Sequence, residues 1–337
     1  MMKKIGYISL TVLALMGGAA LYGYNLAFSS YKGNPVRIYV PAGSSAEQTD
    51  SIIRNSLPGA FGSKVAKLWK WTAEESSQSH GSYLISPGQK SWRVAQNIRR
   101  GRQTPVKVTF NNVRTLEQLS NRIADQLELT STQFLDACDS VLPARGFTGP
   151  AQYPAAFLPD SYEFYWTAAP ASVVKRLADD RDKFWNESRR AKAASMGLRP
   201  VDVATIASIV EEETANKSER PMVARLYLNR LAKGMKLQAD PTVKFATGDF
   251  SLRRITGTHL RTPSPYNTYI HEGLPPGPIR IVEKNTLQGV LDAPAHNYLY
   301  MCAKEDFSGT HNFATDYQTH IANARRYQAA LNKRGIK

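Results

Sequence analysis

The stretch Asp202–Thr214, DVATIASIVEEET, predicts the helix around which the rest of this chain is organised. Its apolar residues recur at helical spacing and share one face: Val203, Ile206, Ile209 and Val210. Glu213 falls near the middle of this face, whereas Glu211 and Glu212 fall on its flanks and can stay in solvent. A carboxyl group held against apolar side chains has a raised pKa, which suits a general acid at neutral pH. From these residues alone, a helix end with a solvated acidic cluster is the plainer interpretation, and both stay open.

Length and charge narrow the possible functions. The 337 residues are enough for about two domains, and the net charge of +15 implies attraction to nucleic acid, phospholipid head groups or an acidic wall polymer. The basic residues are spread out, and their tightest cluster, Arg99, Arg100 and Arg102, is too sparse for a nucleic-acid-binding arm. The two cysteines, Cys138 and Cys302, give no metal cluster or disulfide framework, and they are free thiols or a single pair.

Residues 1–31 predict a transmembrane signal anchor. Lys3 and Lys4 precede a run from Ile5 to Tyr31 that has no charged residue and is long enough to cross a bilayer. The lysines favour an amino terminus inside the cell. A cleaved signal peptide is the alternative, because Gly17–Ala20 offers small residues. In either case most of the chain lies outside the cytoplasm, which argues against nucleic acid as a partner.

Residues 32–150 predict a small module that contains a weak repeat, with 36–57 resembling 106–127. Each copy has an alternating strand, then a capping box and a helix: Val36–Val40 with Ser45 and Gln48, and Val106–Phe110 with Thr115 and Gln118. Such units recognise a ligand or are purely structural, and both interpretations stay open. Trp69, Trp71 and Trp92 lie between the copies and either stack on sugar rings or pack in the core.

A break at Pro143 and Gly146–Pro150 predicts a domain boundary, after which 151–337 form a second domain. The expected elements are a loop at 154–164, helices at 171–192 and from Ser218 to Gly234, a strand at 297–302 and a helix at 315–332. Four segments rich in Pro and Gly are expected to build a pocket: 237–243, 262–269, 273–279 and 309–314. The predicted fold class is α+β, a mixed α/β domain with the helix at 202–214 at its centre.

Several motifs of this second domain recur in order in the endolytic murein transglycosylases, the MltG or YceG-like family, which the chain resembles over roughly residues 155–337. They are Ala207–Thr214, Ser218–Arg220, Asn229–Arg230, Met235–Leu237, Gln238–Thr242, Tyr266–Tyr269, Gly273–Gly277 and Tyr298–Tyr300. The anchor and the strand–helix module fit the amino-terminal part of this family, whose module is LysM-like.

The resemblance implies a single-pass inner-membrane enzyme that cuts nascent peptidoglycan strands between N-acetylmuramic acid and N-acetylglucosamine. It implies a 1,6-anhydro product, the end of strand elongation and a peptidoglycan synthase as partner. The catalytic residue of the family is the second glutamate of a Glu-Lys-Glu-Thr motif, which falls on Glu213. Glu212 stands here where the family has a lysine, and its charge is expected to raise the pKa of Glu213 slightly.

Other site residues are open to two interpretations. Gln238 and Asp240 orient Glu213 or bind N-acetyl groups, unless Asp240 only caps a short helix. Tyr266, Asn267 and Thr268 line a glycan groove or form a turn, and His311 binds substrate or is structural. Arg230 points toward Glu213 or extends into solvent. No residues have metal-ligand spacing, so neither a metal nor a cofactor is expected.

Two other functions stay open. One is a lysozyme-type hydrolase with Glu213 as the acid and Asp240 as its partner, which would release reducing ends. The other is a non-catalytic wall-binding scaffold that recruits synthases, although such a protein needs no glutamate on the apolar face of a core helix.

Overall fold

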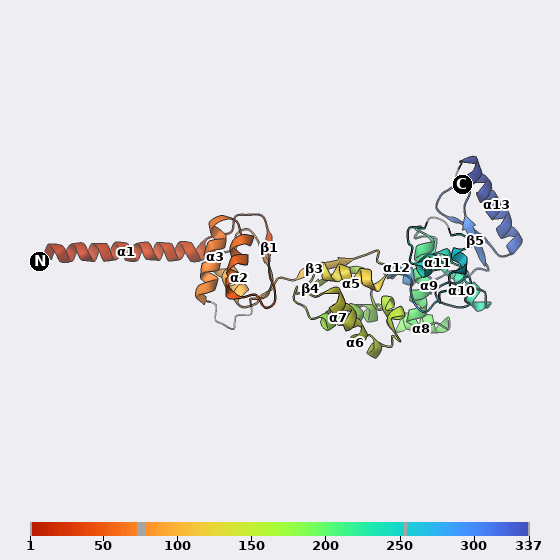
Figure 1. Cartoon of the computed structure of the whole chain (residues 1–337), viewed down its shortest axis with the longest axis horizontal. Coiled ribbons are helices and arrows are strands. Elements are labelled where there is room, and N and C mark those ends of the chain that lie inside the picture. The colour runs from red at the N-terminus through yellow and green to blue at the C-terminus, as the bar shows by residue number, and fades with distance from the viewer. Residues whose placement is uncertain (1, 73–78, 253–254, 336–337) are drawn as a thin grey trace. The chain divides into compact units, whose positions relative to one another are not determined.

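The computed structural model describes residues 2–72, 79–252 and 255–335, with the backbone alone for residues 2–11 (Figure 1). The chain forms two compact units. Unit 1 comprises Met1–Val108, Ala124–Leu129 and Tyr162–Ala169, and unit 2 comprises Thr109–Ile123, Thr130–Ser161 and Pro170–Lys337. Helices combine with two-stranded sheets in both, which confirms the α+β class. The predicted domain ranges 1–31, 32–150 and 151–337 stay a prediction.

Unit 1 is built on the antiparallel pair β1 (Val36–Val40) and β2 (Gly81–Ile85), in which Val36 pairs with Ile85 and Val40 with Gly81. Three helices pack with this pair: α2 (Ala46–Ser56), α3 (Gly59–Thr72) and α4 (Ser91–Arg99). The core between them is apolar because alternate strand residues and one face of each helix point inward: Ile38, Val40, Ile53, Val65, Trp69, Tyr83 and Ile98.

The predicted strand–helix repeat is present in the local structure. Ser45 and Gln48 form the expected capping box at the start of α2. The second copy is β3 (Val106–Phe110) followed by α5 (Leu116–Ala124), where Thr115 accepts from the Gln118 backbone N–H at 3.1 Å. The Gln118 side chain accepts from Arg114 instead of Thr115, so this second capping box is incomplete. The copies differ in partner, since β1 pairs with β2 and β3 pairs with β4 (Asp160–Phe164).

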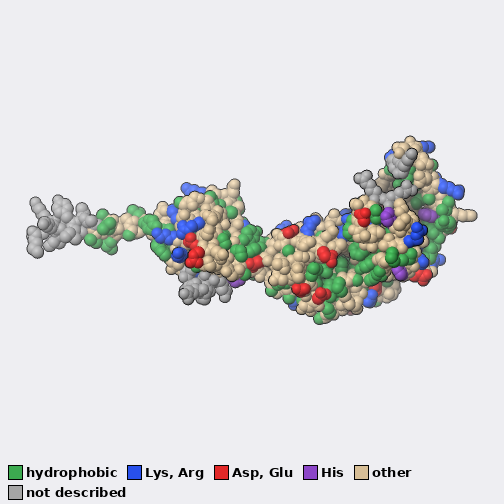
Figure 2. Space-filling view, viewed as in Figure 1, with side chains coloured by type: hydrophobic (Ala, Val, Ile, Leu, Met, Phe, Trp, Pro, Cys, Tyr) green, Lys and Arg blue, Asp and Glu red, His purple; other side chains and the backbone are tan. Residues whose placement is uncertain are grey.

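The three tryptophans between the two strand–helix copies divide between core and surface. Trp69 is 2% exposed and donates its indole N–H to Ser79 at 2.9 Å, so it packs in the core. Trp71 and Trp92 are 64% and 43% exposed. Over the face drawn in Figure 2, Lys and Arg side chains are spread across both units, in agreement with the diffuse charge expected from the sequence.

The chain begins with α1 (Met2–Phe28). Its described apolar part is Val12–Phe28, and no single helix among the described residues is both long and apolar enough to cross a membrane. The bent pair α8 (Glu187–Ser195) and α9 (Pro200–Glu213) passes the same test together, by length and composition only. The side chains of residues 2–11, on which part of the predicted anchor falls, lie outside the described residues.

Unit 2 contains the remaining helices and the antiparallel pair β5 (Tyr300–Ala303) and β6 (His311–Ala314). Its other helices are α6 (Ser131–Val141), α7 (Pro170–Phe184), α10 (Arg220–Ala232), α11 (Asp240–Thr247), α12 (Lys284–Leu291) and α13 (Tyr317–Lys333). Cys138 is buried in α6 and Cys302 lies half-buried in β5, and both are free thiols.

Three predicted elements of the second domain were wrong. The single helix at 171–192 is broken at Trp185–Asn186 into α7 and α8, because Asn186 caps α8 by accepting from the Arg189 backbone N–H. The loop at 154–164 ends in strand β4. The segment 309–314, taken for a loop, contains β6, whose pairing with β5 could not be read from so short a segment.

Candidate active site

Helix α9 occupies the centre of unit 2, in contact with α8, α10, α11 and α12. It begins at Pro200, and the Asp202 carboxylate accepts from the Arg199 backbone N–H at 2.8 Å. The sequence predicted one apolar face, but every residue from Val203 to Glu211 is buried. Small residues make this possible, since Ala204, Ala207 and Ser208 let neighbouring segments approach the other faces. Ser208 also accepts from the Ile279 backbone N–H at 3.0 Å.

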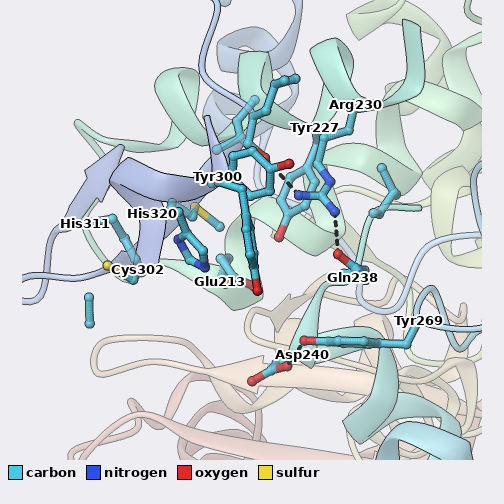
Figure 3. A pocket seen from close by; sticks show the side chains of 16 residues that line it. Glu213, Tyr227, Arg230, Gln238, Asp240, Tyr269, Tyr300, Cys302, His311 and His320 are labelled. Carbon is cyan, nitrogen blue, oxygen red and sulfur yellow. Dashed lines mark hydrogen bonds between the residues drawn. The ribbon is translucent and has the colours of Figure 1, made fainter. Parts of the chain in front are cut away.

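Glu213 is the last residue of α9 and lines a cavity of about 430 Å³ (Figure 3). Its Oε2 atom is buried and has no hydrogen-bond partner among the described residues. Burial raises the pKa of Glu213 to about 7, and the charge of Asp240 acts in the same direction. A hydrogen bond from Tyr227 and the charge of Lys244 act against this rise in pKa. The carboxyl group can therefore be protonated near neutral pH, as a general acid must be.

Helix α10 supplies two further residues of the cavity wall, Tyr227 and Arg230. Burial and the charge of Glu213 hold the pKa of Tyr227 well above its usual value, so its hydroxyl keeps its proton. Arg230 turns into the protein and donates to Lys236 O at 2.9 Å, Leu299 O at 2.8 Å and Gln238 Oε1 at 2.6 Å. It thus ties the cavity wall together and does not extend into solvent.

Gln238 and Asp240 both line this cavity (Figure 3). Gln238 has φ of 52°, a left-handed conformation that costs energy in a residue with a side chain. Its amide is held by Arg230, and Asp240 accepts from the Tyr269 hydroxyl at 2.6 Å. Asp240 does begin helix α11, but no side-chain capping bond is made there, and Ala239 occupies the N-cap position.

Of the next predicted group, Asn267 and Thr268 are fully buried and do not line the cavity. Thr268 accepts from the Ala239 backbone N–H at 3.1 Å, and its carbonyl accepts from the Gln238 N–H at 3.1 Å. Asn267 donates to Thr262 O at 2.9 Å, and the Tyr266 ring packs on Phe245 with centroids 4.6 Å apart. These residues fix the loop that carries Gln238 and Asp240.

His311 lines the cavity from strand β6. Its backbone N–H donates to Glu219 Oε1 and its ring Nδ1 lies beside Glu219 Oε2, both at 2.7 Å. Nearby, His320 stacks on Tyr300 with centroids 5.4 Å apart. Burial and the charge of Arg230 lower the pKa of His320, which favours the neutral form of this ring.

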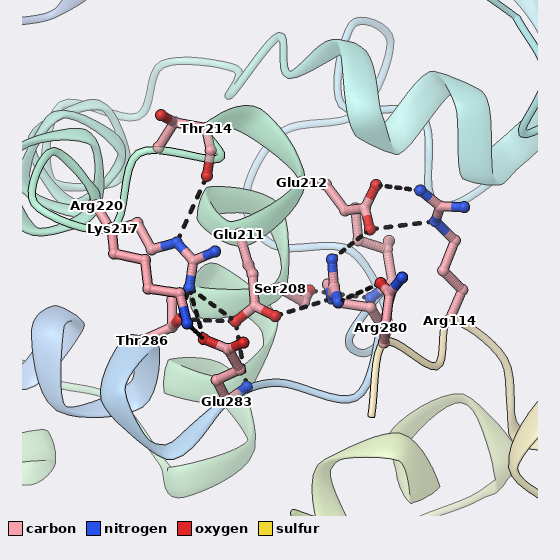
Figure 4. Close-up of polar contacts among 12 residues, drawn as sticks. Arg114, Ser208, Glu211, Glu212, Thr214, Lys217, Arg220, Arg280, Glu283 and Thr286 are labelled. Carbon is pink, nitrogen blue, oxygen red and sulfur yellow. Dashed lines mark hydrogen bonds and ion pairs between the residues drawn. The ribbon is translucent and has the colours of Figure 1, made fainter. Parts of the chain in front are cut away.

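The prediction that Glu211 stays in solvent was wrong (Figure 4). Its side chain is 2% exposed and lies 3.1 Å from Arg280 Nε and 3.5 Å from Arg220 Nη1. Its Oε2 also accepts from Thr286 Oγ1 at 2.7 Å and from the Glu283 backbone N–H at 3.2 Å. These partners lie outside helix α9, at later positions in the sequence, so helical periodicity could not reveal them.

Glu212 is also enclosed, with 16% of its side chain exposed. Arg114 donates to both carboxylate oxygens at 3.0 and 3.1 Å, and Arg280 donates to Oε1 at 2.7 Å. The prediction that the charge of Glu212 raises the pKa of Glu213 was wrong, because two arginines neutralise it and the acting charges are those of Asp240 and Lys244. Glu211 and Glu212 instead fix the end of α9 that carries Glu213.

Sequence reasoning did not single out Tyr227, Tyr269, Tyr300 or Glu219. Tyr269 and Tyr300 do lie in motifs that the sequence analysis quoted, and Tyr227 lies one helical turn before Arg230. Glu219 likewise lies in the motif Ser218–Arg220. Together the cavity holds one carboxyl group whose raised pKa lets it carry a proton near neutral pH and one carboxyl group held by a tyrosine, which suits acid–base chemistry on a polar substrate. Among the described residues no three His, Cys, Asp or Glu side chains are grouped to bind a metal.

Comparison with known proteins adds independent findings. The sequence profile of the YceG-like family matches residues 38–326. An endolytic murein transglycosylase of Bacillus subtilis (strain 168) is 27% identical, over 95% of this chain and 93% of that protein. One of Streptococcus pneumoniae (strain D39) is 29% identical over 41% of this chain and 26% of that protein. A crystal structure of a putative yceG-like protein from Listeria monocytogenes has the same fold, with a TM-score of 0.57 and 24% identity over 86% of this chain and 98% of that one.

Proposed function

Because this chain belongs to the YceG-like family, we propose that it is an endolytic murein transglycosylase whose catalytic acid is Glu213. It is an enzyme of the lytic transglycosylase class, and its substrate is peptidoglycan. The observation that carries the assignment of Glu213 is its buried Oε2 atom at the wall of a cavity of about 430 Å³, where no described residue offers it a hydrogen bond. A carboxyl group in that setting has a pKa of about 7 and can hold a proton for the substrate.

In the proposed reaction, Glu213 donates its proton to the glycosidic oxygen between N-acetylmuramic acid and N-acetylglucosamine. The bond from that oxygen to the muramyl anomeric carbon breaks as the muramyl ring gains oxocarbenium character. The 6-hydroxyl of the same sugar then attacks the anomeric carbon, and its proton passes to Glu213, which restores the acid. The product is a 1,6-anhydro end, and no water is consumed.

The neighbours of Glu213 have supporting roles in this proposal. Burial raises the pKa of Glu213, the charge of Asp240 adds to that rise, and Tyr269 holds Asp240 in place. Gln238 and His311 offer an amide and an imidazole to the hydroxyl and N-acetyl groups of the glycan. An indirect role falls to Tyr266, Asn267 and Thr268, which fix the loop on which Gln238 and Asp240 lie.

The rival hydrolase would use the same Glu213 but needs an activated water, for which Asp240 is the available carboxylate. Mass spectrometry of fragments released from isolated sacculi separates the two reactions. Anhydro-muramyl ends support the proposed lytic reaction, and reducing muramyl ends would replace it with hydrolysis. A wall-binding scaffold would bind the sacculi and release no fragments.

We further propose that α1 is a single-pass anchor in the cytoplasmic membrane, with its amino terminus inside. Residues 5–31 contain no charged residue, and a helix from Met2 to Phe28 is about 40 Å long at 1.5 Å per residue. The catalytic domain then faces the wall, where unit 1, as a LysM-like module, contacts glycan. An enzyme that cuts nascent strands ends their elongation, so a peptidoglycan synthase is its expected partner.

A further inference from the structure

We propose that unit 1 docks on an anionic phospholipid surface through the face that α3 presents beside the end of α1. The proposal rests on the anchor proposed above, and it adds a second contact between the protein and the membrane. Three features of unit 1 support it: the position of the aromatic residues of α1, the contacts of two lysines of α3, and the exposure of Trp71.

The first feature is the order of apolar and aromatic residues in α1. Ile5–Leu21 covers 17 residues, or about 25 Å of helix, close to the hydrocarbon thickness of about 30 Å. Tyr22, Tyr24 and Phe28 follow at once, and their side chains are 55%, 67% and 51% exposed. Exposed aromatic rings directly after an apolar span are typical of the membrane–water interface. This order places Tyr22 at the level of the lipid head groups.

The second feature is that α3 reaches the same level. Lys67 Nζ donates to the Tyr22 hydroxyl at 2.9 Å and lies 5.2 Å from the Tyr22 ring centroid. Lys64 Nζ donates to Asn25 Oδ1 at 2.6 Å and Ser29 Oγ at 2.7 Å. Since these contacts join α3 to the aromatic end of α1, the lysines lie where phosphate groups would be.

The third feature is Trp71, which is 64% exposed although its neighbour Trp69 is buried. Lys67 Nζ lies 5.2 Å from the Trp71 ring as well, so one ammonium group bridges Tyr22 and Trp71. A Trp side chain whose indole N–H faces water while the rest of the ring faces apolar groups is suited to the head-group region. Trp71 therefore extends the aromatic band of α1 sideways onto unit 1.

The charge of this face selects the kind of lipid. The charged residues of the two helices that contact α1, namely α3 and α4, are all basic: Lys64, Lys67, Lys70, Arg93 and Arg99. Glu74 and Glu75 follow α3 in the sequence and are outside the described residues. Each basic residue near an anionic surface strengthens binding by about fivefold. Phosphatidylglycerol or another anionic lipid is thus favoured over a neutral one.

The test uses the full chain in liposomes that contain phosphatidylglycerol and lipids brominated near the head group, which quench nearby tryptophan fluorescence. The quenched part of the emission should fall in Trp71→Phe and persist in Trp185→Phe, which removes a buried Trp of unit 2. It should fall when phosphatidylcholine replaces phosphatidylglycerol, or in about 1 M salt, where the Debye length is about 3 Å. Quenching that Trp71→Phe leaves unchanged, or that ignores lipid charge and salt, would overturn the docking.

A double variant, Lys64→Gln with Lys67→Gln, tests the lysines themselves. The ratio of quenched to unquenched Trp71 should fall at least about fivefold. Lys175→Gln, a matched change of an exposed lysine in unit 2, should leave the ratio unchanged. Circular dichroism checks that the variants fold. The comparison between low and high salt uses the wild type, so it does not depend on the folding of any variant. Flotation of the protein with the liposomes tests the anchor separately from the docking. Protein that floats while Trp71 stays unquenched would overturn the docking and keep the anchor. Protein that does not float would overturn both.

Discussion

Glu219 accepts hydrogen bonds from both the backbone N–H and the ring Nδ1 of His311, each at 2.7 Å. The same carboxylate accepts from Thr214 Oγ1 at 3.2 Å, and Thr214 directly follows Glu213. Glu219 thus joins the end of α9 to strand β6, and both elements contribute to the cavity wall. Because a carboxylate oxygen only accepts, the contact with Glu219 Oε2 requires a proton on Nδ1 of the His311 ring.

Glu219→Gln should lower kcat by about tenfold to hundredfold, the equivalent of about 1.5–3 kcal/mol for a hydrogen bond to a charged group. The amide can accept from only one of the two His311 N–H groups, so the ring loses its fixed orientation. Kinetics on soluble glycan strands provide the measurement. Glu305→Gln, a change of a half-exposed glutamate between β5 and β6, is the matched control and should keep full activity. Equal activity of the two variants would show that Glu219 does not support catalysis by orienting His311.

Activity should fall as the pH rises through about 7, because the acid form of Glu213 is lost there. In Asp240→Asn this alkaline limb should move to lower pH, since the charge of Asp240 is one cause of the raised pKa. Residual activity at pH 5 to 6 should remain, roughly within the range where Glu213 stays protonated. A limb that stays in place would show that the charge of Asp240 does not raise the pKa of Glu213, and complete loss of activity at every pH would argue for a catalytic carboxylate at Asp240 as in the hydrolase alternative.

Glu211→Ala should destabilise the protein by about 3–5 kcal/mol, because it leaves Arg220 and Arg280 without a buried counter-charge. Urea unfolding measures the change in the free energy of unfolding. Asp50→Asn breaks the surface pair with Arg54 and should cost no more than about 1 kcal/mol. If the two variants lose similar stability, Glu211 does not hold the end of α9.

Gly277→Ala should cost about 1–3 kcal/mol, because a Cβ atom at Gly277 would lie 1.9 Å from the carbonyl oxygen of Ala151. The backbone of residues 151–152 would have to move to make room. Gly257→Ala is the matched control, since no heavy atom lies within 4 Å of a Cβ there. Thermal unfolding of the two variants gives the comparison, and a stable Gly277→Ala would show that the close approach is not required.

Much of the fold could be predicted from local sequence signals. The strands Val36–Val40 and Val106–Phe110 have the predicted bounds, because alternation over five residues between turn signals is specific to a strand. Strands β4 and β6 were missed, since each is short and depends on a partner strand elsewhere in the chain. The break between α7 and α8 was missed because Asn186 caps a helix within an otherwise continuous helical pattern.

The site could be predicted only in part, for a similar reason. The position of Glu213 on α9 follows from helical spacing, so its place at the cavity was expected, although its catalytic role stays a proposal. The burial of Glu211 depends on Arg220, Arg280 and Thr286, whose approach no periodicity encodes. Thr268 was expected in a groove or a turn, and its hydrogen bonds to the Gln238–Ala239 backbone follow only from tertiary structure.

Glu213→Gln is the variant that separates chemistry from folding. In the wild type the pKa of Glu213 is raised from 4.5 to about 7, so the folded state is favoured by protonation. This contribution is fully present below pH 4.5 and is lost as the pH rises through about 7. Glu213→Gln should therefore fold normally and, at pH 8, unfold with a free energy up to about 3 kcal/mol above that of the wild type.

The most direct test of the account is the release of anhydro-muropeptides from isolated sacculi, measured by mass spectrometry for the wild type and for folded Glu213→Gln. The account predicts fragments with 1,6-anhydro-muramyl ends from the wild type and none from the variant. Anhydro fragments released by Glu213→Gln at the wild-type rate would contradict it.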